Sequence, residues 1–187
     1  MRWTVFTIAA WITLGLEWGL RDALQLGDVR IAPSFVFVLV VFISLWARQT
    51  AAMGACLILG AVVDLLGQLP TSDGTDVVVL GPHALGYLLA GYTVLTLRAL
   101  MFRRNIISLA FLVLLTGVLA QILVTFLLGV RTVYDNVLFD QPLVELGQRL
   151  GSALYSAVLA IPFGAALNVI RPIFGFEADT RRGFRIQ

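Results

Sequence analysis

Long apolar stretches alternate with short polar connections along almost the whole chain. The stretches cover residues 3–20, 31–47, 51–69, 81–101, 106–130 and 150–170. A helix needs about 20 apolar residues to cross the hydrocarbon core of a bilayer, and every stretch is close to that length. The pattern therefore predicts six membrane-spanning helices joined by short connections.

Two of these stretches, 31–47 and 51–69, also contain residues that favour buried strands, and hydrophobic periodicity alone does not exclude strands. Strands, however, rarely exceed ten residues, and in lipid only helices and closed barrels pair every backbone group. A barrel needs alternating polar and apolar residues, which these stretches lack. We expect an all-α polytopic membrane protein, a six-helix bundle forming a single integral-membrane domain over 1–187. Five spans is the alternative if one short segment lies at the interface.

Composition supports a membrane protein. Hydrophobic residues make up 59% of the 187 residues, charged residues 13%, and the mean hydropathy is +0.94. Soluble domains have about 45–50% apolar and about 25% charged residues, so the composition excludes disorder and disfavours a water-soluble globule. Six helices of about 20 residues use roughly 120 residues. No room remains for a separate catalytic domain.

The N-terminal stretch resembles a signal peptide in one respect, because Arg2 precedes an apolar run. The first 30 residues contain no A-x-A cleavage site, so we favour an uncleaved first span. Trp3 and Trp18 would lie about 22 Å apart along a helix, which suits anchors near the two membrane interfaces.

The arginines predict the orientation. All 13 basic residues are arginine, and with the N-terminus inside, nine fall on the cytoplasmic side and four outside. The positive-inside rule therefore places both termini in the cytoplasm, and cytoplasmic arginines also suit anionic lipid or an acidic partner. The cytoplasmic set is Arg2, Arg48, Arg98, Arg103, Arg104, Arg171, Arg181, Arg182 and Arg185.

Asp64 is the first candidate for function, because an ionisable side chain inside a span costs a few kcal/mol. Gly60 and Asp64 share one face of the third predicted helix, and His83, Tyr87 and Gly91 form a matching stripe on the fourth. If these two helices form a hairpin, Asp64 reaches Tyr87 or His83. The pair then serves as a proton relay or a ligand site or, as we favour, as a hydrogen bond that fixes the hairpin.

The other candidate groups are weaker. Glu17 lies near the outer end of its span beside Trp18, where it can reach water, and the single cysteine, Cys56, suits a small core residue. Pairs of glycines with GxxxG spacing favour either internal packing or a partner helix. These pairs are Gly15 with Gly19 and Gly147 with Gly151.

Motifs for catalysis and metal binding are absent from the sequence. It has one histidine, no lysine, no H-E-x-x-H and no glycine-rich phosphate loop. An aspartyl intramembrane protease would need a second buried aspartate beside Asp64. We expect no enzymatic activity, no metal, no cofactor and no nucleic-acid partner.

The segment GAVVDLLGQL, followed by LGPHALGYLLAGY, resembles the signature of the rod shape-determining protein MreD family. That signature reads approximately G-x-x-x-D-L-L, a short loop, then L-G-x-H-A-L-x-Y-L-L-x-G-Y. The resemblance covers roughly residues 33–104, the connection TSDGTDVVV is longer than usual, and the last third has no matching motif. Matching positions are Gly60, Asp64, Leu65, Leu66, Leu80, Gly81, His83, Ala84, Leu85, Tyr87, Leu88, Leu89, Gly91 and Tyr92.

The resemblance implies a non-enzymatic scaffold in the bacterial inner membrane, within the cell-elongation complex that builds peptidoglycan. It implies binding to the bitopic protein MreC and links to MreB filaments, the RodA glycosyltransferase and a penicillin-binding transpeptidase. The structural or interaction residues that it implies are Asp64, His83, Tyr87, Gly60, Gly81, Gly91 and Tyr92.

A second hypothesis follows from the same resemblance. Such proteins are similar in fold to the substrate-binding S-components of energy-coupling-factor transporters, so the alternative is a small-molecule-binding transporter subunit. That function requires a polar cavity of about 300 Å³ or more.

Overall fold

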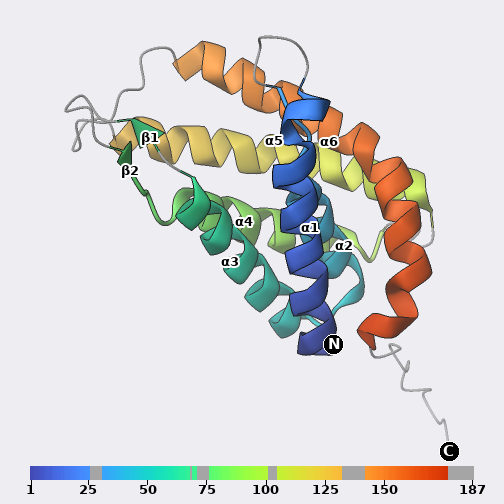
Figure 1. The fold of residues 1–187 in the computed structure, drawn as a ribbon. Coiled ribbons are helices and arrows are strands. Elements are labelled where there is room, and N and C mark those ends of the chain that lie inside the picture. The colour runs from blue at the N-terminus through green and yellow to red at the C-terminus, as the bar shows by residue number, and fades with distance from the viewer. Residues whose placement is uncertain (26–30, 68, 71–75, 101–104, 132–141, 177–187) are drawn as a thin grey trace, which may run out of the picture.

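The computed structural model describes residues 1–25, 31–67, 69–70, 76–100, 105–131 and 142–176. Six α-helices make up most of this part of the chain, which confirms the expected all-α bundle (Figure 1). A pair of two-residue antiparallel strands, β1 and β2, lies between α3 and α4, and a 3-10 helix, η2, follows α6. The elements are α1 (Trp3–Leu24), α2 (Phe35–Trp46), α3 (Gln49–Leu66), β1 (Leu69–Pro70), β2 (Asp76–Val77), α4 (Pro82–Leu97), α5 (Ile106–Arg131), α6 (Pro142–Ile170) and η2 (Arg171–Phe174).

The helices differ in length. Four segments of the described chain are long and apolar enough to cross a membrane, namely α1, α3, α5 and the stretch from α6 into η2. Helix α2 has only 12 residues and α4 only 16, so they rise about 18 and 24 Å. Both are shorter than the apolar stretches that predicted them, because α2 begins after its N-cap Ser34 and α4 ends at Leu97, before the predicted stretch does.

Helix α2 forms the centre of the bundle. Every residue from Phe35 to Leu45 is buried, and α2 contacts α1, α3, α4, α5 and α6. This position explains its sequence, FVFVLVVFISLW, which is apolar on every side, since a helix surrounded by other helices has no face toward water.

Neighbouring helices along the chain pack side by side, α3 on α4, α4 on α5 and α5 on α6 (Figure 1). The α3–α4 contact is close enough to require glycine. A Cβ added at Gly60 would lie 2.5 Å from the Ala84 Cα, so only a residue without a side chain lets these two backbones approach. The predicted hairpin of the third and fourth helices is therefore present.

The described carboxylates gather at one end of the bundle, whereas the described arginines are divided between the two ends, with Arg21, Arg131 and Arg149 on the side of the carboxylates. Four arginines lie where α1 and α3 begin and where α2, α4 and α6 end, and we call this the arginine end. They are Arg2, Arg48, Arg98 and Arg171. The opposite end, where α2 and α4 begin, holds the described carboxylates, and we call it the carboxylate end.

Candidate functional site

Asp64, in the last turn of α3, binds the start of α4. Its Oδ2 accepts hydrogen bonds from the backbone N–H groups of Gly81 (2.8 Å) and Ala84 (3.1 Å). Its Oδ1 accepts from the His83 backbone N–H (3.0 Å) and lies 2.8 Å from the His83 Nδ1. The first N–H groups of a helix have no partner within the helix, and a negative charge there also interacts favourably with the helix dipole. Asp64 is thus an N-cap supplied by a neighbouring helix.

The local sequence Gly-Pro-His prepares the start of α4 for this cap. Gly81 has a φ of 127°, in the region that side-chain-bearing residues rarely adopt, and glycine adopts it without strain. Pro82 fixes the first turn and lacks the N–H that would otherwise need a partner. Because Gly81 has no side chain with which to cap its own helix, the cap must come from elsewhere, and Asp64 provides it.

The other predicted site residues on α4 lie in different surroundings. Tyr87 is buried and makes edge-on ring contacts with His83 at 6.3 Å and with Phe37 at 5.4 Å between centroids. It is not among the hydrogen-bond donors to Asp64 in the described residues. Tyr92, by contrast, is 57% exposed and points away from this site.

Gly91 mediates a second close contact between α4 and α3. A Cβ at Gly91 would lie 2.5 Å from the Cys56 Sγ and 3.2 Å from the Ser44 Oγ. Cys56 is fully buried, as expected for a small core residue. Among the predicted topology residues, Arg103 and Arg104 lie outside the described residues, whereas Arg48 and Arg98 stand at the arginine end.

Glu17 forms a cap of the same kind, which sequence reasoning missed. Its Oε2 accepts from the backbone N–H of Val36 (2.8 Å) and from the Ser34 hydroxyl (3.2 Å). Ser34 in turn accepts from the Phe37 N–H at 3.1 Å. The expectation for Glu17 gave its place toward the end of α1 but not this role, because its position in the apolar run gives no sign that the start of α2 lies beside it.

One feature of the sequence could have identified this second cap. Val36 follows Glu17 by 19 residues, and His83 follows Asp64 by the same 19 residues. In both places an acidic residue near the end of a long helix precedes a polar connection and then a short apolar helix. The repeat spacing is visible in the sequence, although only the structure shows that both carboxylates turn toward backbone N–H groups.

The first turn of α2 is also tied to α6. The backbone N–H of Ser34 donates to the Ser156 hydroxyl at 2.8 Å, and that hydroxyl donates to the Ser152 carbonyl at 2.7 Å. The start of α2 therefore connects α1, through Glu17, with α6, through Ser156.

A small cavity of about 60 Å³ adjoins the Asp64 cap. Arg149 of α6 lies on its wall and pairs with Glu145 at 2.8 Å. The described residues contain no group of three histidine, cysteine or carboxylate side chains that could hold a metal ion. The cavity is too small for the ligand that an S-component binds. Its walls are Asp64, Gly67, Val79, Pro82, His83, Leu128 and Arg149.

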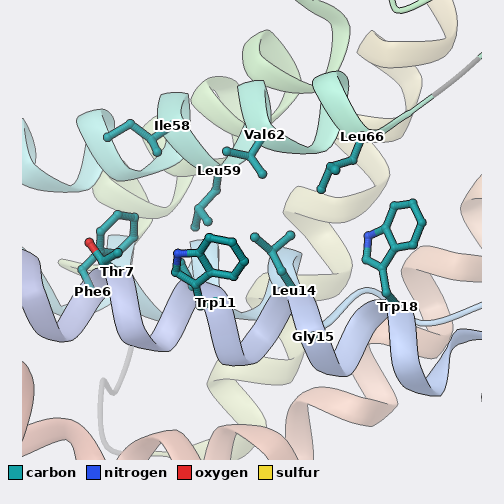
Figure 2. Close-up of a pocket in the computed structure, with 11 residues that line it drawn as sticks. Phe6, Thr7, Trp11, Leu14, Gly15, Trp18, Ile58, Leu59, Val62 and Leu66 are labelled. Carbon is teal, nitrogen blue, oxygen red and sulfur yellow. The ribbon is translucent and has the colours of Figure 1, made fainter.

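A larger groove of about 510 Å³ runs between α1 and α3 (Figure 2). Side chains from the two helices face one another across it, and Thr7 supplies the one hydroxyl. Trp11 is 74% exposed there, and nothing lies within 4 Å of a Cβ added at Gly15. The groove exceeds 300 Å³, but its lining is apolar, unlike the cavity expected for the transporter alternative. Its walls are Phe6, Thr7, Ala10, Trp11, Leu14, Gly15, Trp18, Ile58, Leu59, Val62 and Leu66.

Comparison with known families shows where this arrangement belongs. A profile described as rod shape-determining protein MreD matches residues 1–170. The chain belongs to the MreD family. The match extends well beyond the motif region 33–104, and it includes α1 with Glu17 as well as all of α6. No curated protein and no solved structure matches the chain.

Membership of the MreD family gives a cellular role at a coarse level. The family is one of membrane proteins that act in rod-shape determination, and the four long apolar helices agree with a membrane location. The similarity to S-components of transporters stays a prediction.

Proposed function

We propose that this MreD-family protein is a non-enzymatic scaffold whose α1–α3 groove receives the single membrane-spanning helix of an MreC-type bitopic protein. The groove is the observation that carries the proposal. Its residues on α1 extend from Phe6 to Trp18, which is about 18 Å along the helix or more than three turns. A groove of that length accommodates one side of a helix rather than a single side chain.

The surface of the groove suits contact between helices inside a membrane. Helices in lipid associate through close packing, and small residues allow the backbones to approach. Gly15 leaves its part of the groove open, while Trp11 and Trp18 offer large exposed rings on either side of it along α1. An apolar partner helix with side chains that fit between the tryptophans would bury these rings.

The two carboxylate caps support this proposal because they hold the two walls of the groove. Glu17 ties α1 to the start of α2, and Asp64 ties α3 to the start of α4. Helix α2 contacts both α1 and α3. In the proposed function, Asp64, His83, Tyr87 and the nearby glycines set the position of α3 without contacting the partner.

The wider role that we infer follows from the family. An MreC-type partner would link the chain to MreB filaments, to RodA and to the penicillin-binding transpeptidase. The chain would act as a single integral-membrane domain in the inner membrane, with both termini in the cytoplasm.

The test fills the groove at Gly15. Gly15→Leu places a branched side chain in the groove, and the matched control is Gly19→Leu, since Gly19 also has open space around it on α1 but does not line the groove. The measurement is co-purification of a tagged MreC-type protein with each variant from membranes. We expect Gly15→Leu to reduce the recovered partner about tenfold, the effect of roughly 1–3 kcal/mol of overpacking.

The control separates the possible outcomes. Gly19→Leu should recover the partner as the unaltered chain does. Equal recovery with Gly15→Leu would mean that the partner binds another face, whereas equal loss in both variants would mean that α1 as a whole is disturbed. Failure of the unaltered chain to recover any MreC-type protein would contradict the scaffold role itself.

A further inference from the structure

The four arginines of the arginine end form one connected surface, although they come from different parts of the chain. The Arg98 Nη1 donates to the Ala47 carbonyl at 2.7 Å, at the end of α2 and next to Arg48. The Arg171 guanidinium lies 4.1 Å from the ring centroid of Trp46, the last residue of α2. These contacts gather three of the arginines around the end of α2.

Arg2 joins the same surface through η2. Its backbone N–H donates to the Phe174 carbonyl at 2.9 Å, and its side chain lies along Gly175. Phe174 is itself buried against Phe42 of α2, with ring centroids 6.1 Å apart. The first turn of the chain and its last described turn therefore meet at this end, and both bring an arginine.

Charge at this end is of one sign. Within the described ranges, the carboxylate side chains of Glu17, Asp22, Asp64 and Glu145 all belong to the opposite half of the bundle. The sequences that continue from this end, 101–104 and 177–187, contain five arginines against two carboxylates.

Two tryptophans lie beside these arginines. Trp3, next to Arg2, is 48% exposed, and Trp46 lies beneath the Arg171 guanidinium. Tryptophan is enriched where membrane helices pass from the hydrocarbon core to the headgroup layer. Arginines beside such residues meet phosphate oxygens, to which a guanidinium donates paired hydrogen bonds.

We propose that the arginine end binds the headgroups of anionic phospholipids, with Arg2 and Arg48, both exposed, as the main contacts. Arg98 and Arg171 hold the surface together through their contacts with α2 and add to its positive charge. A membrane surface fits better than an acidic protein segment, because the arginines stand around the ends of several helices and tryptophans lie beside them. This inference does not depend on the partner helix in the groove.

The test compares two double variants with the same change in charge. Arg2→Gln with Arg48→Gln alters the arginine end, and Arg21→Gln with Arg131→Gln alters the carboxylate end. The full chain is purified in mixed micelles of phosphatidylglycerol and phosphatidylcholine, and native mass spectrometry gives the ratio of the two lipids retained. We expect the unaltered chain to retain more phosphatidylglycerol than phosphatidylcholine. In the Arg2/Arg48 variant the ratio of retained phosphatidylglycerol to phosphatidylcholine should be about tenfold lower.

The Arg21/Arg131 variant should keep the preference, and added salt should weaken it in the unaltered chain because exposed charges are screened. Equal loss in both double variants, or no preference for phosphatidylglycerol in the unaltered chain, would overturn the proposal. Binding of a polyglutamate peptide in the absence of any lipid preference would overturn it in favour of an acidic protein partner. Arg2 and Arg48 are exposed, and the bond from Arg2 to Phe174 is made by the backbone N–H, which glutamine keeps.

Discussion

The caps at Glu17 and Asp64 answer the same structural need in different ways. Each short inner helix begins inside the bundle, where its first N–H groups need an acceptor. At α4 one carboxylate accepts from three backbone N–H groups and contacts the His83 ring. At α2 the Glu17 carboxylate shares this role with Ser34, the helix's own N-cap residue. Removing the Asp64 carboxylate therefore leaves more backbone N–H groups without an acceptor than removing the Glu17 carboxylate does.

The largest loss of stability should come from Asp64→Leu. It leaves three backbone N–H groups, one buried and two partly buried, without an acceptor, at about 1–3 kcal/mol each, so we expect the thermal midpoint in detergent to fall by about 10 °C. Cys56 is the single cysteine and is fully buried, so a thiol-reactive fluorescent dye reports unfolding directly. Asp64→Asn should lose less, since one acceptor oxygen remains, and Asp22→Asn, at an exposed carboxylate, should change nothing. An unchanged midpoint for Asp64→Leu would show that water replaces the cap.

Glu17→Leu should lower the same midpoint by about 5 °C. It removes the acceptor for Val36 but leaves the bond from Phe37 to Ser34, so fewer groups lose a partner. The combined variant Glu17→Leu with Ser34→Ala should approach the loss seen for Asp64→Leu, measured with the same Cys56 dye. If Glu17→Leu alone matched Asp64→Leu, the shared cap at α2 would have no protective value.

The smallest fall in the thermal midpoint, about 3 °C, should come from His83→Leu. It removes the ring contact with Asp64 while the three backbone donors stay in place. Circular dichroism melting, together with the Cys56 dye, tests this ranking. A loss as large as that of Asp64→Leu would mean that the ring, rather than the backbone, provides most of the stabilisation.

The two caps also show what the sequence reveals and what it conceals. Asp64 is conspicuous because Val62, Val63, Leu65 and Leu66 surround it, and its approach to His83 follows from a hairpin. Most of the groups that donate to Asp64 belong to the backbone of α4, and they reach it because Gly60 lets α4 approach α3 closely. A pattern of residue types does not specify how closely two helices approach.

Glu17 was undervalued for a different physical reason. The apolar run ends at residue 20, so the sequence placed Glu17 near water, but α1 continues through Arg21 and Asp22. The same limit applies to α2. Its apolar stretch is long enough to predict a full span, whereas capping at Ser34 starts the helix late. The number and order of the helices were thus predictable, and so were the starts of α1, α4 and α5, whereas the starts of α2 and α6 were not.

The lengths of the helices have a consequence for the start of the two short ones. The C-terminal ends of α2 and α4 come together at one end of the bundle, where Arg98 bonds to Ala47. Helices α5 and α6 rise about 39 and 44 Å, against about 18 Å for α2. The long helices therefore extend beyond the central helix α2, and the start of α2, like that of α4, is closed off by a carboxylate from a neighbouring helix.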